Sequence, residues 1–145
     1  MYKRQSLVDP QIGAAGDVDT AAVTMTYADG RIAVIRNSRR AAYGYDQRVE
    51  VLGSIGMLQA ENMRDTTVIR SDAHGVSYAK PKFFFLERYE AAFKAEWDAF
   101  VNALAAGSAM PATLGDGVNA LAVAEAAARS AQTGQAVTVA QGAAA

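Results

Sequence analysis

The hydrophobic period of this chain changes at Lys80-Pro81-Lys82, and this change limits the folds that the chain can adopt. Before it, apolar and polar residues alternate, which is the period of a half-buried strand. After it, apolar residues recur at steps of three and four, as in an amphipathic helix: Leu86, Tyr89, Phe93, Trp97, Phe100, Val101 and Leu104. Strands followed by helices predict an α+β fold, with helices packed on one face of a mostly antiparallel open sheet.

Tight turns divide the strand region. Asp29-Gly30 joins the runs 20–28 and 31–36, and this residue pair favours a type I′ hairpin. Further β-type runs follow at 47–52, 57–61, 66–70 and 76–78, and a short final strand is expected at 137–139. Because strands joined this closely pair with each other, we expect an antiparallel sheet of about six strands.

Two helices are expected after the strands. The first ends at Gly107, and the second begins near Asp116, which is spaced from Thr113 as in a capping box. We expect residues 1–140 to form one domain and residues 141–145 to be a frayed tail. Two helices cover only part of such a sheet. The other face is left for a partner domain, a second subunit or a substrate, and the sequence does not choose among them.

Composition excludes several classes of function. The chain has 145 residues, is 51% hydrophobic and has a formal net charge of −1, so electrostatics do not favour binding to nucleic acid or to an anionic membrane. It has no cysteine, which excludes disulfides and thiolate sites and is compatible with a cytoplasmic location. No apolar run approaches the roughly 20 residues of a membrane span, and the first residues do not lead into a signal peptide.

Three features that suggest catalysis or cofactor binding have simpler interpretations. Residues 115–120 match the dinucleotide pattern G-x-G-x-x-A, but no strand precedes them and no acidic residue follows at the required distance, so a capped helix start is favoured. His74, the one histidine, falls in a predicted hairpin turn, and without cysteines only carboxylates remain as further zinc ligands, which argues against a zinc site. Lys80-Pro81 lies at the junction of strands and helix, where proline is common.

The segment 37–47 is the strongest candidate for a ligand site. It lies between two predicted strands and contains Arg40, Tyr43, Tyr45 and Asp46, with Gly44 between the two tyrosines. Arginine and tyrosine at a strand end suit the hydroxyl or carboxylate groups of a small polar ligand. An exposed polar connection whose tyrosines pack on the domain edge explains the same residues equally well.

At this segment the sequence resembles the Gfo/Idh/MocA oxidoreductases, and within them the members that oxidise inositol. The similarity runs from Arg39-Arg40 through Tyr43-Gly44-Tyr45-Asp46 to the turn 53–58, and continues through Arg88-Tyr89 to Asp116-Gly117 and beyond. The resemblance implies a two-domain enzyme. Its N-terminal Rossmann half binds NAD or NADP, and its C-terminal sheet half shapes the substrate pocket and builds dimers or tetramers. The family's catalytic lysine belongs to a Glu-Lys-Pro motif, which Ala79-Lys80-Pro81 does not match.

The resemblance therefore implies that this chain is the substrate-binding and oligomerisation domain of a polyol or sugar dehydrogenase. Tyr45 corresponds to a polyol-contacting tyrosine of the family, with Tyr43, Arg40 and Asp46 as neighbouring candidates. No catalytic, metal-binding or cofactor-binding residue is expected on this chain alone, and the expected partners are a Rossmann half and further copies of the chain. The alternative is a free-standing α+β module that self-associates or binds a small ligand without catalysis.

Overall fold

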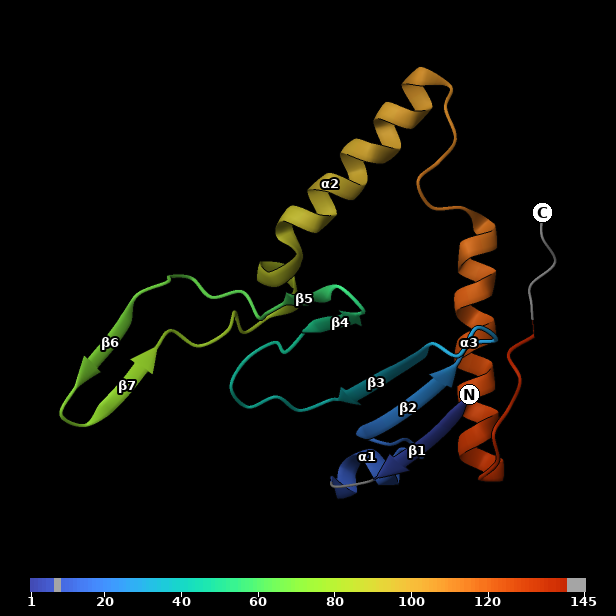
Figure 1. Cartoon of the computed structure of the whole chain (residues 1–145), viewed down its shortest axis with the longest axis horizontal. Coiled ribbons are helices and arrows are strands. Elements are labelled where there is room, and N and C mark those ends of the chain that lie inside the picture. Colours follow the sequence, from blue (N-terminus) through green and yellow to red (C-terminus); the bar gives the residue numbers. More distant parts are fainter. Residues whose placement is uncertain (7–8, 141–145) are drawn as a thin grey trace. The chain divides into compact units, whose positions relative to one another are not determined.

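The computed structural model describes residues 1–6 and 9–140. These residues form two compact units (Figure 1). The first unit combines residues 1–40 with the chain from Met110 onward, and the second unit is Ala41–Ala109. Each unit is described by itself below. The expected tail, residues 141–145, lies outside the described residues.

The first unit is a three-stranded antiparallel sheet with a long helix. Its strands are β1 (Tyr2–Ser6), β2 (Thr20–Thr26) and β3 (Ile32–Ser38), in the spatial order β1-β2-β3. Its helices are the short α1 (Pro10–Ala14) and α3 (Leu114–Thr133). The predicted hairpin between β2 and β3 is confirmed. Its turn is not type I′, because Gly30 has a positive φ of 87° whereas Asp29 does not.

The core of the first unit lies where α3 packs beside the sheet (Figure 1). Val23 of β2 and Ala126 and Ala127 of α3 are buried. Ser130 is fully buried, and its hydroxyl accepts a 2.9 Å hydrogen bond from the Lys3 backbone N–H and donates at 2.7 Å to the Gln135 carbonyl. Small side chains let the helix approach the strands closely, and the buried hydroxyl is satisfied on both sides.

Three elements of this unit differ from the sequence prediction. β1 was not expected, because residues 2–6 are mostly polar and show no clear period, and α1 was not expected, because five residues are too few to show a helical period. The strand expected at 137–139 does not form: Val137 exchanges two backbone hydrogen bonds with Met1, of 2.8 and 3.0 Å, and no ladder continues from them. The predicted helix 116–133 is confirmed as α3, which begins two residues earlier, at Leu114.

The second unit contains two hairpins and one helix. β4 (Val49–Gly53) pairs with β5 (Gly56–Ala60), β6 (Ile69–Asp72) pairs with β7 (Gly75–Tyr78), and α2 is Phe85–Ala106. α2 ends where Gly107 adopts the left-handed conformation with a φ of 60°, as predicted. The stripe of aromatic and aliphatic residues on α2 is largely exposed, and Trp97 keeps 65% of its surface accessible.

The α+β class and the antiparallel pairing are confirmed, but the strands of the described residues form three separate sheets rather than one continuous sheet. The connections around the hairpins explain this difference. Residues 39–48 and 61–68 are irregular segments. The prediction had assumed that the strands before and after each of these segments pair with one another. Among the described residues, no helix is both long and apolar enough to span a bilayer.

Candidate functional site

The candidate loop, residues 41–48 of the second unit, is shaped by Gly44. This glycine is buried and has a φ of 137°, a conformation that L side chains rarely adopt. A Cβ atom at this position would lie 2.7 Å from the Pro81 carbonyl oxygen and 3.0 Å from the Pro81 Cβ. The glycine between the two tyrosines therefore allows the loop to lie directly against the segment that leads into α2.

Backbone hydrogen bonds join three segments beneath the loop. The Tyr45 N–H donates at 2.7 Å to the Lys82 carbonyl, and the Lys82 N–H donates at 2.9 Å to the Met63 carbonyl. An isolated antiparallel bridge pairs Arg64 with Pro81. Residues 43–46 thus rest on a framework formed by the connection after β5 and the chain before α2. Such backbone pairing restrains a loop that side-chain contacts alone would leave mobile.

The Asp46 carboxylate is the centre of a charged cluster on this loop. It accepts hydrogen bonds from the Arg48 guanidinium at 2.7 and 2.8 Å, from the Asn62 amide at 2.7 Å and from the Tyr43 hydroxyl. The Arg48 guanidinium, followed by the Tyr43 and Asn62 donors, lowers the pKa of Asp46 well below its ordinary value. The hydrogen bond to Asp46 raises the pKa of Tyr43, so the hydroxyl keeps its proton and acts as the donor in this pair.

Tyr45 belongs to a second, aromatic cluster. Its ring meets the Tyr89 ring edge to face, with centroids 5.6 Å apart, and Tyr89 meets Phe93 in the same way at 6.0 Å. Burial, and then the neighbouring Tyr45 hydroxyl, raises the pKa of Tyr89. The aromatic contacts fix the plane of the Tyr45 ring and hence the direction of its hydroxyl.

Three of the four predicted site residues lie on the loop of the second unit. Tyr43 and Asp46 are bonded to each other, and Tyr45 lies beside them in the chain but packs on Tyr89. Arg40 belongs to the first unit, where its guanidinium pairs with the buried carboxylate of Asp9.

Sequence reasoning missed Tyr89, Arg48 and Asn62. Tyr89 was assigned to the apolar stripe of the helix, although Arg88-Tyr89 is part of the resemblance to the oxidoreductases. Arg48 is two residues from Asp46, a spacing that allows an ion pair but does not predict one. Asn62 is 16 residues from Asp46 in sequence, and no local pattern marks it.

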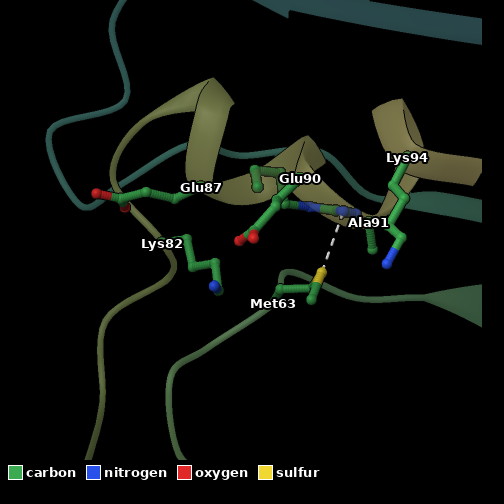
Figure 2. Close-up of a pocket in the computed structure, with 7 residues that line it drawn as sticks. Met63, Lys82, Glu87, Glu90, Ala91 and Lys94 are labelled. Atoms are coloured by element: carbon green, nitrogen blue, oxygen red, sulfur yellow. Dashed lines mark hydrogen bonds between the residues drawn. The ribbon is translucent and has the colours of Figure 1, made fainter. Parts of the chain in front are cut away.

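An open pocket of about 310 Å³ lies on the polar side of α2, lined by Met63, Lys82, Glu87, Arg88, Glu90, Ala91 and Lys94 (Figure 2). The Met63 side chain reaches toward α2 and accepts a 3.2 Å hydrogen bond from the Arg88 guanidinium. The charges around the pocket are mixed, and this side of the helix is opposite the one that carries Tyr89 and Phe93. The pocket is therefore distinct from the tyrosine loop and shows no preference for one sign of charge.

The glycine pattern 115–120 and His74, for which the sequence disfavoured cofactor binding or catalysis, lie at a helix start and in a turn. Thr113 and Asp116 form the predicted capping box: the Asp116 N–H donates to the Thr113 hydroxyl oxygen at 3.2 Å, and the Thr113 N–H donates to the Asp116 carboxylate at 2.8 Å. His74 lies exposed in the turn between β6 and β7. Within residues 1–6 and 9–140, no three His, Cys, Asp or Glu side chains are grouped to hold a metal ion.

The family model for the C-terminal alpha/beta domain of an oxidoreductase family, Gfo/Idh/MocA, matches residues 1–139. The chain belongs to this family. Its sequence is 45% identical over 124 residues to the myo-inositol 2-dehydrogenase of Thermotoga maritima, an alignment that covers 86% of this chain and 37% of that protein. The resemblance seen in the sequence is thus confirmed.

Two solved structures share the fold. The myo-inositol dehydrogenase of Corynebacterium glutamicum is 41% identical with a TM-score of 0.89, over 97% of this chain and 43% of that one. The scyllo-inositol dehydrogenase of Lactobacillus casei, solved with bound NAD(H) and scyllo-inositol, is 26% identical with a TM-score of 0.83, over 92% of this chain and 40% of that one. The chain spans about 40% of the length of the curated relatives it matches.

Proposed function

We propose that this chain is the substrate-binding and oligomerisation domain of an NAD(P)-dependent polyol dehydrogenase that oxidises inositol. The observation that carries the proposal is the loop Tyr43-Gly44-Tyr45-Asp46, held rigidly against the start of α2 in a chain 45% identical to a myo-inositol 2-dehydrogenase. A rigid pair of tyrosines suits the ring of hydroxyl groups that a cyclic polyol presents.

In the proposed site, the tyrosines orient the polyol. Tyr45 offers the hydroxyl of a ring that is held by Tyr89. Tyr43, which is half exposed, offers a second hydroxyl on the same loop. Arg40 is retained as a neighbouring candidate, since only one of its guanidinium nitrogens is engaged by Asp9 and the others can donate. Holding the reacting carbon in the correct orientation removes a large part of the activation barrier. This orienting role is the one that we assign to this chain.

The described residues do not fit the cofactor. The one glycine pattern of the dinucleotide type begins α3, and there the Asp116 carboxylate and the Thr113 hydroxyl form the helix cap. An acidic side chain at this position repels a pyrophosphate. We therefore propose that NAD or NADP is held by a Rossmann half, as the resemblance implies, and that the combined enzyme is cytoplasmic.

We further propose that the enzyme is a homodimer or homotetramer assembled through its strands. Both hairpin β4-β5 and strand β3 expose aliphatic side chains, among them Val34, Leu52, Leu58 and Ile55, and Leu52 keeps 79% of its surface accessible. Apolar strand surface of this kind is costly in water and is typical of an interface. Light scattering at micromolar concentration tests this proposal, and a monomer contradicts it.

The activity is tested by expressing the full open reading frame that encodes this chain and, separately, residues 1–145 alone, and by measuring the oxidation of myo-inositol. We expect NAD- or NADP-dependent oxidation of myo-inositol by a protein that includes a Rossmann half, and no turnover by residues 1–145 alone. Turnover by residues 1–145 alone would overturn the assignment of roles. If residues 1–145 are the whole product, and they bind a ligand or self-associate without activity, the free-standing module is favoured instead.

The role of Tyr45 is tested by Tyr45→Phe, which keeps the ring on Tyr89 and removes only the hydroxyl. We expect kcat/KM for inositol to fall about tenfold or more, because a lost hydrogen bond of about 1.5 kcal/mol corresponds to such a factor. Tyr27→Phe is the control, because it removes the hydroxyl of a surface tyrosine at the β2–β3 turn of the other unit. Equal effects of the two substitutions would refute the assignment.

A further inference from the structure

The carboxylate of Asp46 has no acceptor position to spare. Its Oδ1 accepts from Arg48 Nε at 2.7 Å and from Asn62 Nδ2 at 2.7 Å. Its Oδ2 accepts from Arg48 Nη2 at 2.8 Å and from the Tyr43 hydroxyl. A carboxylate offers about four lone-pair sites, and all four are used. A substrate hydroxyl that bound Asp46 would have to displace one of these donors.

Asn62 connects this carboxylate to the backbone of the loop. Its side-chain oxygen accepts from the Gln47 N–H at 2.7 Å while its nitrogen donates to Asp46 at 2.7 Å. The two bonds fix both ends of the amide, so its orientation is determined. The next residue, Met63, accepts from the Lys82 N–H, and Lys82 in turn holds Tyr45. A half-buried asparagine outside the loop thus closes a cycle of hydrogen bonds around it.

We propose that Asp46 and Asn62 are positioning residues that set the Tyr43 hydroxyl as a hydrogen-bond acceptor for the polyol; this inference rests on the proposed function. Because the Tyr43 proton is directed at Asp46, the free side of the Tyr43 oxygen presents lone pairs only. The substrate group that meets it must therefore be a donor. A free ring hydroxyl satisfies this requirement, whereas a methyl ether or a ring carbonyl at the same position does not.

A double-mutant cycle with Asn62→Ala and Tyr43→Phe tests the proposal in the enzyme made from its native reading frame. Each single variant is expected to raise KM for inositol about tenfold and to leave KM for the coenzyme unchanged. The double variant is also expected to show about a tenfold increase, because Asn62 acts through Tyr43. An increase of about a hundredfold, the product of two independent effects, would overturn the proposal. Asn102→Ala, at an exposed position on α2, is the matched control and should change neither constant.

A second variant separates positioning from general destabilisation. Asn62→Asp keeps an acceptor for the Gln47 N–H but removes the donor to Asp46 and places a second carboxylate beside it. We expect KM for inositol to rise in this variant while hydrogen exchange at the Gln47 amide stays slow. In Asn62→Ala the same amide should exchange at least tenfold faster. If Asn62→Asp retains the parental KM, the Asp46 contact does not position Tyr43.

Hydrogen exchange also separates failure of this inference from failure of the proposed function. If the parent enzyme oxidises no polyol, the proposed function fails, and positioning is then judged by exchange and by the Tyr43 ring signals. Faster exchange at Gln47 and shifted Tyr43 signals in Asn62→Ala would still support the arrangement of the loop. Unchanged exchange and unchanged ring signals would refute it, whatever the activity.

Discussion

Substitution of Gly44 by alanine should destabilise the second unit by more than the same substitution at any glycine of its two hairpins. The φ of 137° at Gly44 costs a non-glycine residue about 1–3 kcal/mol. The added Cβ would also lie 2.7 Å from the Pro81 oxygen and 3.2 Å from the Lys82 oxygen, and both of these are backbone atoms that cannot rotate away. Overpacking of this kind costs about another 1–3 kcal/mol.

Gly75 provides a closely matched control for this prediction. It lies in the same unit with a φ of 127°, and a Cβ added there meets nothing within 4 Å. Gly75→Ala therefore carries the conformational cost without the collision. We expect Gly44→Ala to lower the free energy of unfolding by about 1–3 kcal/mol more than Gly75→Ala.

Urea denaturation followed by fluorescence measures this difference, because the one tryptophan of the chain, Trp97, lies on α2 of the same unit. The midpoint should fall further for Gly44→Ala than for Gly75→Ala, with similar slopes. Equal midpoints for the two variants would refute the reasoning, because they would mean that the Pro81 and Lys82 carbonyls can move aside without cost.

Two further predictions concern buried and ionised groups. Ser130→Ala should lower the stability of the first unit by about 1–3 kcal/mol, because it leaves the Lys3 N–H without its acceptor. Circular dichroism during urea denaturation measures this loss, and a change below about 0.5 kcal/mol would contradict the prediction. Asp46 has a lowered pKa when folded, so its stabilising contribution is present above the ordinary value of about 3.9 and is lost as the pH falls through the folded value. The difference in free energy of unfolding between the parent and Asp46→Asn should accordingly be constant from about pH 5 to 7 and shrink in acid. A difference that persists at the lowest pH would show that the carboxylate charge is not responsible.

Features that depend on neighbouring residues were predictable from the sequence. Thr113 and Asp116 are three residues apart and do form the cap of α3, and Gly107 ends α2 in the left-handed conformation. The hairpin at Asp29-Gly30 forms because both of its strands lie within a few residues of the turn. In each case the interacting groups are close in sequence, so spacing and side-chain type are sufficient.

Features that depend on distant residues were not predictable. Residues 2–6 are a polar run with no clear period, and they become β1 because β2 offers its edge and Ser130 accepts the Lys3 N–H from 127 residues away. The division of the strands into three sheets has the same origin, since strand propensity does not specify which strands pair.

The candidate site illustrates the same division. The sequence alone identified the loop with Tyr43, Tyr45 and Asp46, because donors cluster there and the family motif is contiguous. Only the tertiary structure showed that Asn62 and Arg48, together with Tyr43, saturate the Asp46 carboxylate. Only the structure showed that Tyr89 fixes Tyr45 and that Gly44 faces Pro81. The physical reason is that a motif specifies which groups are present, whereas the direction of each hydroxyl depends on hydrogen-bond partners that folding brings from elsewhere in the chain.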